Sequence, residues 1–399
     1  MEVKTDKQTV DKILNRGIIK DVLPDLNTFR QRLISGERLR FYIGVDPTAD
    51  TLHLSHAKNY MLLEEFRRLG HEVIVLFGDF TARIGDPTER QSARKQLDSD
   101  EIKQNVSAWR EQIAPLMDFD SDDNPPIVKY NSDWLAELTF SDIVELASNF
   151  TVQQMIERDM FQARIDKNQP IFMHEFFYPL MQGYDSVAME VDVELCGTDQ
   201  IFNAMSGRTL VKRLIDREKH VVAVNLMENP KTGELMSKSR GTGVFLNTPP
   251  NDMYGSIMAQ PDEMIELLLI NNTRIDLDEV AKIIEGSPRQ AKARAAYEIV
   301  SIFHGKGAAF AAQEAFDKQF QQGEAPEDIP IVELDGSSWT TADLLYELKL
   351  VDSKTEGRRV LSQNGVKVNG RQIAQAELDL NEGDVVQVGK RKFVRITLK

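Results

Sequence analysis

Two histidines, His53 and His56, stand three residues apart at the start of a segment, 53–69, whose apolar residues recur at helical spacing. Residues at i and i+3 lie on one side of a helix, so both imidazoles are expected to project from its first turn. That turn also carries backbone N–H groups without helical partners and the positive end of the helix dipole. The spacing alone favours a capping histidine beside a surface histidine, whereas the helix start favours a phosphate ligand.

A second segment that could bind phosphate lies far downstream. Residues 235–240 read Leu-Met-Ser-Lys-Ser-Arg and place Lys238 between two serines, just before Gly241. A lone loop lysine is usually only solvated, but small flanking residues suit a loop that closes over a ligand. Together with the turn at Asp46-Pro47-Thr48, this loop changes the interpretation of the histidine pair in favour of a nucleotide-phosphate site.

A third candidate set is Tyr178, Gln182 and Asp185, which stand at i, i+4 and i+7 within residues 176–185. Helical spacing puts all three on one face. Their segment is otherwise apolar, so buried polar groups there need partners. The pattern predicts either a polar stripe that satisfies itself or a pocket for a polar ligand.

The elements that must position these residues can be identified from periodicity. Residues 40–45 and the continuous apolar run 73–77 are expected to be buried strands, with the helix 53–69 between them and Gly70 as its stop. Strand, helix and strand in this order form a βαβ unit, which predicts an α/β fold with a Rossmann-like parallel sheet. Residues 221–226 are expected to be a later strand of that sheet.

The rest of the chain suggests three domains. Residues 1–245 are expected to form the catalytic domain, with an inserted segment around 118–180 that includes a helical stretch at 140–165. Residues 246–325 are helix-rich, the polar stretch 321–330 suggests a linker, and 335–399 are expected to form a small α+β domain. A chain of 399 residues is also too long for one ordinary core.

Composition limits the function classes. The single Cys196 excludes a disulfide framework and favours a reducing cytoplasm, and no run approaches the length of a membrane span. Apart from the pair at 53 and 56, the histidines are scattered, so we expect no protein metal site. The net charge is −15, but residues 335–399 carry eleven Lys/Arg against nine Asp/Glu and can contact a phosphate backbone locally.

The motifs resemble those of a known family. Residues 46–56, ending in His53-Leu54-Ser55-His56, resemble the "HIGH" signature of class I aminoacyl-tRNA synthetases in the form found in bacterial-type tyrosyl-tRNA synthetases. Residues 235–239 resemble the "KMSKS" loop, and the similarity extends from about residue 18 to residue 399. It implies that ATP, with Mg²⁺, activates an amino acid to an aminoacyl-adenylate before transfer to tRNA.

Roles at the phosphates follow from this resemblance. It implies that Thr48, His53 and Lys238 contact the ATP phosphates in the transition state, with His56 nearer the ribose and the α-phosphate. The implied ATP-binding residues are Gly44, Asp46, His53, Ser55, His56, Gly197, Asp199 and Lys238, with Asp199 on the ribose. Two positions depart from the pattern, because Ser55 replaces a glycine at the adenine surface and Leu235 replaces the first lysine of the loop.

The resemblance also implies an amino-acid pocket. The implied tyrosine-binding residues are Tyr42, Asp86, Tyr178, Gln182, Asp185 and Gln200. Of these, Tyr178, Gln182 and Asp86 would hold the α-ammonium, Gln200 the carboxylate, and Asp185 with Tyr42 the phenol. A phenylalanine ring would leave the last two groups unpaired, a form of discrimination for which tyrosyl-tRNA synthetases are the standard example.

The tail, 335–399, resembles a small RNA-binding domain that is also found in a ribosomal small-subunit protein. A basic helix near 353–360, a hairpin turn at Asn369-Gly370 and a later strand pair carry this resemblance. The alternative is an ordinary α+β cap with surface arginines. The implied RNA contacts are Lys354, Arg358, Arg359 and Lys367, mainly to backbone phosphates.

The expected activity is the ligation of tyrosine to tRNA by a homodimer that binds tyrosine, ATP and tRNA and no membrane. Two alternatives stay open. One is activation of another aromatic amino acid. The other is an RNA-binding paralogue without catalytic activity, which only the replacements Ser55 and Leu235 favour.

Overall fold

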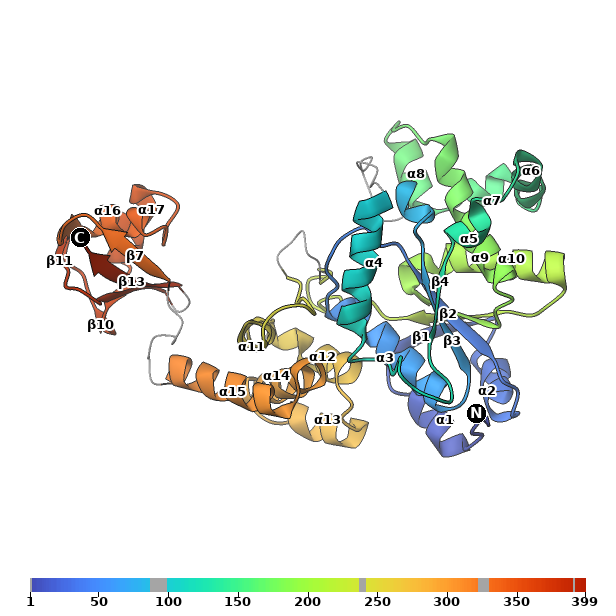
Figure 1. Cartoon of the computed structure of the whole chain (residues 1–399), viewed down its shortest axis with the longest axis horizontal. Helices are drawn as coiled ribbons and strands as arrows, with labels where there is room; N and C mark the ends of the chain where they lie inside the picture. The colour runs from blue at the N-terminus through green and yellow to red at the C-terminus, as the bar shows by residue number, and fades with distance from the viewer. Residues whose placement is uncertain (1, 87–98, 237–241, 322–329, 390–391) are drawn as a thin grey trace. The chain divides into compact units, whose positions relative to one another are not determined.

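The computed structural model of the chain describes residues 2–86, 99–236, 242–321, 330–389 and 392–399 (Figure 1). It divides into two compact units, Met1–Lys306 and Gly307–Lys399. Among the helices of these described segments, none is long and apolar enough to cross a membrane. The predicted domain boundaries near 245 and 325 stay a prediction.

A six-stranded sheet forms the centre of the first unit. Its strands are β1 (Ile19–Leu23), β2 (Arg40–Val45), β3 (Glu72–Phe77), β4 (Ile127–Tyr130), β5 (Val193–Gly197) and β6 (His220–Val224). They follow the order β1-β6-β5-β2-β3-β4, and every neighbouring pair is parallel except β1 with β6. The predicted α/β fold with a Rossmann-like sheet is therefore confirmed.

The sheet has a topological switch point between β2 and β5. From β2 the chain continues to β3 and β4 on one side, whereas β5 is followed by β6 on the other side. Ligands of such sheets bind at the carboxyl ends of the strands where the order reverses. The loops after Val45 and Gly197 are therefore the expected place for a site.

Helices cover the sheet and hold these loops. The helices of the first unit are α1 (Lys7–Leu14), α2 (Leu26–Ile34), α3 (Leu54–Arg68), α4 (Ser99–Ile113), α5 (Ser132–Leu135), α6 (Phe140–Ala147), α7 (Val152–Ile156), α8 (Asp159–Asp166), α9 (Phe177–Ala188), α10 (Ile201–Ile215), α11 (Pro250–Met258), α12 (Ile265–Asn272), α13 (Leu277–Ile284) and α14 (Pro288–His304). Helices α11 to α14 pack on one another beside the sheet, and α12 also contacts α3 (Figure 1).

Helices α9 and α10 pack closely because of two glycines. A Cβ added at Gly183 would lie 2.9 Å from Leu210 and 3.2 Å from the backbone nitrogen of Gly207. Only glycine permits this approach, so the helix that carries the candidate pocket residues is held against α10.

The region expected to be inserted differs in detail from the prediction. The helical stretch 140–165 is interrupted, because α6 ends at Ala147 and Thr151 caps the next helix by accepting a hydrogen bond from the backbone nitrogen of Gln154. Strand β4, within the expected insertion 118–180, pairs with β3 and belongs to the sheet. The short helices α5 to α8 follow it.

The second unit contains helices α15 (Lys306–Gln321), α16 (Thr341–Glu347) and α17 (Lys354–Ser362). Its strands are β7 (Ile331–Leu334), β8 (Ser338–Thr340), β9 (Val366–Val368), β10 (Arg371–Gln372), β11 (Glu377–Asp379), β12 (Val385–Val388) and β13 (Lys392–Leu398). Five form the sheet β10-β9-β12-β13-β7 over a core that includes Leu344, Val386 and Ile396. The predicted hairpin is confirmed, since Asn369 and Gly370 both have positive φ between β9 and β10.

Candidate active site

The histidine pair stands at the predicted helix start. His53 is the N-cap of α3, and the ring centroids of His53 and His56 are 4.1 Å apart. The backbone nitrogen of His53 donates to Nδ1 of His56 at 3.3 Å. The structure therefore brings both imidazoles together at the N-terminus of the helix that follows β2. Ser55 lies between them in the same turn.

Burial sets the protonation state of this pair. It lowers the pKa of His53 to about 4 and that of His56 to about 3, where the His53 and Lys58 charges add to the effect. Both rings are therefore neutral near pH 7. A neutral imidazole can still donate one N–H hydrogen bond to a phosphate oxygen, but it adds no positive charge.

The segment after the second motif runs beside the first. Lys238 lies outside the described residues, and the chain that follows it is described from Thr242 onward. The backbone nitrogen of Leu54 donates to Val244 O at 3.0 Å, and that of Leu246 donates to Leu52 O at 2.9 Å. His53 also forms an isolated antiparallel bridge with Phe245. The segment that follows the second motif is thus joined to the first motif by backbone pairing. Leu235, which precedes residues 237–241 in the chain, is exposed.

Helix α4 holds the turn that precedes the histidines. This contact was not predicted from the sequence. Three of its side chains donate to backbone oxygens of the turn: Asn105 Nδ2 to Pro47 at 2.8 Å, Trp109 Nε1 to Ala49 at 2.6 Å and Gln112 Nε2 to Asp50 at 2.9 Å. The three donors stand at i, i+4 and i+7, a spacing that indicates a shared helix face but not the turn that this face contacts. Thr48 lies in this turn, and its nitrogen donates to Asp46 O at 2.7 Å.

A glycine lies at or next to the carboxyl end of each of the two strands at the switch point. Gly44 is exposed near the end of β2, and Gly197 ends β5 just before a single 3₁₀ turn that contains Asp199. A Cβ at Gly197 would lie 2.3 Å from a carboxylate oxygen of Asp199, so a side chain there would displace the Asp199 carboxylate from this position. Burial raises the pKa of Asp199 above its usual value.

A buried lysine beside this strand end was also missed. Lys58 lies on α3, and its ammonium donates to Asn59 Oδ1 at 2.7 Å. Burial lowers the pKa of Lys58 to about 7, while the Asp199 carboxylate opposes this shift. No sequence signal marked it, because a single lysine in a helix is usually solvated.

Carboxylates gather where the resemblance implies an ammonium. Tyr178 donates from its hydroxyl to Asp46 Oδ2 at 2.8 Å, and Gln200 Nε2 donates to Asp86 Oδ2 at 2.6 Å. Burial raises the pKa of Tyr178 well above its usual value, and Asp46 and Asp86 raise it further. Asp46, assigned above to ATP, thus connects the phosphate end of the site with α9.

The predicted phenol-binding pair is buried, with partners that the sequence did not indicate. Asp185 accepts hydrogen bonds from Trp134 Nε1 at 2.8 Å and from Asn131 Nδ2 at 3.4 Å. Burial raises the pKa of Asp185 well above its usual value. The Tyr42 hydroxyl lies 3.0 Å from Ser186 Oγ, with which it shares a hydrogen bond. Residues of α5 and α9 therefore define this end of the pocket.

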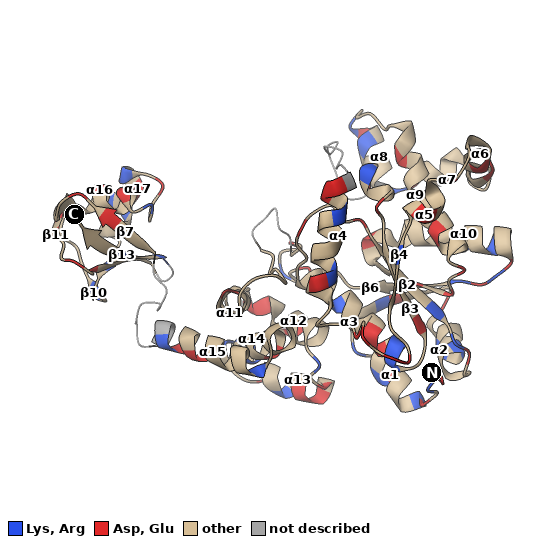
Figure 2. Cartoon of the chain, viewed as in Figure 1, with Lys and Arg blue, Asp and Glu red and all other residues tan. Residues whose placement is uncertain are grey.

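The predicted RNA contacts lie on the second unit. Lys354, Arg358 and Arg359 belong to α17, a helix with blue segments in Figure 2, and Lys367 lies on β9. Lys354 forms an ion pair with Asp343 at 2.7 Å, and Arg359 with Glu356 at 3.4 Å. Exposed pairs of this kind are weak, so a phosphate can replace the carboxylates.

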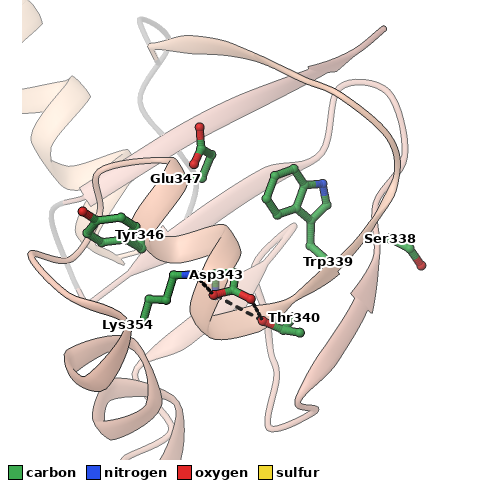
Figure 3. A pocket seen from close by; sticks show the side chains of 7 residues that line it. All are labelled: Ser338, Trp339, Thr340, Asp343, Tyr346, Glu347 and Lys354. Carbon is green, nitrogen blue, oxygen red and sulfur yellow. Dashed lines mark hydrogen bonds and ion pairs between the residues drawn. The ribbon is translucent and has the colours of Figure 1, made fainter.

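A hollow of about 440 Å³ adjoins this helix (Figure 3). The residues that line it are Ser338, Trp339, Thr340, Asp343, Tyr346, Glu347 and Lys354. It belongs to the second unit and contains none of the residues at the β2–β5 switch point.

Two family models match the chain. Residues 35–321 match the model described as tRNA synthetases class I (W and Y), and residues 342–386 match the S4 domain. Curated tyrosine–tRNA ligases are similar over nearly the whole chain. The protein from Moorella thermoacetica is 39% identical over 96% of this chain and 95% of its own length. That from Thermotoga maritima is 39% identical over 97% of this chain and 96% of its own.

Solved structures share the fold. A C-terminally truncated mitochondrial tyrosyl-tRNA synthetase from Aspergillus nidulans has a TM-score of 0.66 at 24% identity and covers 78% of this chain and 94% of its own. A tyrosyl-tRNA synthetase from Archaeoglobus fulgidus, solved with L-tyrosine, has a TM-score of 0.59 at 19% identity, over 77% of this chain and 100% of its own. With a matching family model and relatives of this identity and coverage, the chain belongs to the tyrosyl-tRNA synthetase family of class I tRNA synthetases and carries a C-terminal S4 domain.

Proposed function

We propose that the chain is a tyrosine–tRNA ligase, which activates tyrosine with ATP and then transfers the tyrosyl group to the 3′ end of its tRNA. The observation that carries this proposal is the backbone pairing of residues 244–246 with 52–54. It joins the segment that follows 237–241 to the histidine pair, at the switch point of a parallel sheet. Full-length relatives that carry the name tyrosine–tRNA ligase support the same activity.

In the first step, a carboxylate oxygen of tyrosine attacks the α-phosphorus of ATP, and the bond to pyrophosphate breaks. The protein supplies positioning and charge stabilisation instead of a covalent nucleophile. In our proposal the neutral rings of His53 and His56 and the hydroxyl of Thr48 donate hydrogen bonds to the phosphates. Lys238 supplies positive charge, and Asp199 holds the ribose. Gly44 and Gly197 leave room for the nucleotide.

The amino acid lies along α9 in this proposal. Its α-ammonium faces Tyr178, Gln182 and the carboxylates around them. The phenol meets Tyr42 and Asp185, and Gln200 contacts the carboxylate. Support comes from the burial of Asp185 and Tyr42, since a buried carboxyl and a buried hydroxyl select a substrate that can complete their hydrogen bonds.

In the second step, a hydroxyl of the terminal ribose of tRNA attacks the carbonyl of the adenylate, and AMP leaves. We propose that residues 246–325 and the S4 domain orient the tRNA, with Lys354, Arg358, Arg359 and Lys367 on its phosphates. The exposure of these side chains on α17 and the weak ion pairs that two of them form support this role.

Mg²⁺ is proposed to arrive with ATP. Within the described segments, no group of three or more His, Cys, Asp or Glu could hold a metal ion. That finding is compatible with Mg²⁺ here, because this ion is often held by substrate phosphates and water with few protein ligands. When bound, it would neutralise charge on the leaving phosphates.

We also propose a homodimer that works in the cytoplasm. Large apolar side chains are exposed in the segment between β4 and α9, among them Phe140 at 83%, Val152 at 70% and Met173 at 72%. We propose that they are covered in the dimer, because contiguous exposed apolar surface marks protein interfaces. A Phe140→Glu variant is expected to shift the molecular mass from dimer towards monomer in light scattering, whereas the exposed Phe310→Glu should leave it unchanged. An unchanged mass in Phe140→Glu would contradict this interface.

The test of the activity is ATP–pyrophosphate exchange with tyrosine, phenylalanine and tryptophan. We expect exchange with tyrosine alone. Exchange with phenylalanine or tryptophan instead would mean that the chain activates another aromatic amino acid. The absence of exchange with all three would favour an RNA-binding paralogue without catalytic activity.

A further inference from the structure

A buried ion pair lies behind α9, outside the residues assigned above. Glu194 on β5 is 1% exposed, and Lys219, just before β6, is 0% exposed. The Lys219 ammonium forms an ion pair with Glu194 and donates to Ser186 Oγ at 2.7 Å and to Ala204 O at 3.2 Å. All three of its N–H donors are thereby used.

Such a pair needs an explanation beyond stability. Desolvation of two charges often offsets their attraction, so a hydrophobic pair of similar volume would commonly hold the core as well. Glu194 and Lys219 lie where two neighbouring parallel strands are otherwise apolar. The contacts of the pair with α9 are therefore the informative part.

On one side, the pair fixes the amide of Gln182. The Nε2 atom of Gln182 donates to Glu194 Oε1 at 2.9 Å. A carboxylate only accepts hydrogen bonds, so the NH₂ group must face Glu194 and the amide oxygen must face away. An amide oxygen is an acceptor, which is what an α-ammonium requires.

On the other side, the pair reaches Tyr42 through Ser186. Because Lys219 donates to Ser186 Oγ, the serine proton can go to Tyr42 at 3.0 Å or to Glu194 at 3.4 Å. The shorter contact is with Tyr42. A tyrosine that accepts from Ser186 keeps its own O–H as a donor for another group.

The packing around the pair leaves room for this network. A Cβ at Gly207 would lie 2.5 Å from the Lys219 ammonium and 2.8 Å from Ser186 Oγ. The absence of a side chain at this position of α10 is thus required for Lys219 to reach Ser186.

We propose that the Lys219–Glu194 pair is a positioning element of the amino-acid pocket, which turns the Gln182 oxygen towards the substrate ammonium and, through Ser186, turns the Tyr42 hydroxyl towards the substrate phenol. This inference rests on the proposed function. It adds Glu194, Lys219 and Ser186 as residues that determine specificity without touching the substrate.

The test measures binding of tyrosine, phenylalanine and a tyrosine analogue without the α-amino group by calorimetry on the full chain. Two double variants separate the Gln182 link. Glu194→Gln/Lys219→Met keeps an acceptor for Gln182, whereas Glu194→Leu/Lys219→Met removes it; both avoid an unpaired buried charge. The Leu/Met variant is expected to bind tyrosine roughly tenfold more weakly than the Gln/Met variant, and the difference should vanish with the analogue.

Ser186→Ala tests the Tyr42 link. It should weaken tyrosine binding roughly fivefold to tenfold and leave phenylalanine binding unchanged, because phenylalanine has no phenol to orient. The matched control is Glu64→Gln/Arg67→Met, which neutralises another buried pair at the far end of α3. It should leave all three affinities unchanged even if it lowers the melting temperature.

Two results would overturn the proposal. One is a tyrosine affinity within twofold of wild type in folded Ser186→Ala and Leu/Met variants. The other is a loss of affinity that is as large for phenylalanine, or for the analogue without the α-amino group, as it is for tyrosine. ATP–pyrophosphate exchange is measured on the same samples. Tyrosine binding that follows the pattern above without any exchange would contradict the proposed function and leave the positioning role standing.

Discussion

At the scale of single residues, burial decides which charges the site can use. His53 and His56 are neutral near pH 7, so the positive charge for a triphosphate must come from elsewhere. The helix N-terminus, Lys238 and the buried Lys58 are the available sources in our proposal. Burial also raises the pKa of Asp185, which favours the carboxyl form that can both donate and accept.

Asp185→Asn is the first test at this scale. The substitution keeps the volume and an acceptor for Trp134, but it removes the ionisable carboxyl. We expect kcat/KM for tyrosine in ATP–pyrophosphate exchange to fall roughly tenfold or more, because an Asn whose oxygen accepts from Trp134 presents only N–H donors to the phenol and cannot accept from its O–H. The KM for ATP should be unchanged, and so should the affinity for phenylalanine measured by calorimetry. An equal loss with phenylalanine would show that Asp185 only supports the fold.

Protonation of buried histidines should limit stability in mild acid. Burial lowers the pKa of His71 to about 4, and its Nδ1 accepts from the backbone nitrogen of Leu39. The unfolded chain, with a histidine pKa near 6.5, binds more protons between pH 6.5 and 4, so stability is complete above 6.5 and decreases as the pH falls. His71→Asn keeps the acceptor. When the pH falls from 6.5 to 4.5, the free energy of unfolding should decrease in both proteins. The decrease should be about 2–3 kcal/mol smaller in His71→Asn than in wild type.

Denaturant unfolding at these two pH values measures the difference. His304→Asn, which replaces a histidine outside the site on α14, is the comparison and should follow the wild-type pH dependence. A His71→Asn curve parallel to that of wild type would show that His71 is not protonated on unfolding in this range.

At the scale of elements, local patterns predicted what is local. The strands β2 and β3 and the helix α3 were predicted within a residue or two, because a continuous apolar run and a 3.6-residue period do not depend on distant partners. The roles of Trp109 and Trp134 could not be predicted in this way. Their indoles donate to groups that are far away in sequence and are brought close only by the sheet order. The same holds for Lys219 and Glu194.

These two tryptophans should divide the site by substrate. Trp109→Phe removes the donor to the turn before the histidines, and Trp134→Phe removes the donor to Asp185. We expect Trp109→Phe to raise the KM for ATP several-fold and Trp134→Phe to raise the KM for tyrosine several-fold. Each substitution should also lower the free energy of unfolding by about 1–2 kcal/mol, because one buried hydrogen bond is lost. Each variant is the control for the other. If both changed the same KM, the division of the pocket between α4 and α5 would be wrong.

At the scale of the whole molecule, charge is divided unequally. Residues 335–399 carry a net charge of +2 within a chain of net charge −15. Such a division lets residues 335–399 contact a phosphate backbone while the rest of the surface repels it, which limits indiscriminate binding. The S4 domain has its own hydrophobic core, so changes on its surface should leave amino-acid activation intact.

Arg358→Ala and Lys367→Ala test this division. Each should weaken tRNA binding roughly threefold to tenfold and lower the salt dependence of log Kd by about one unit, because a phosphate contact releases about one counterion. Lys399→Ala also removes one positive charge from the second unit. Lys399 forms ion pairs with Glu333 and Asp335 and is not part of α17, so this variant should change neither quantity. Binding is measured by filter retention at several salt concentrations. All three variants should keep wild-type tyrosine-dependent exchange, since we propose that the adenylate forms at the β2–β5 switch point and not on the S4 domain. Equal salt dependence in Arg358→Ala and Lys399→Ala would mean that the basic helix is not the tRNA contact.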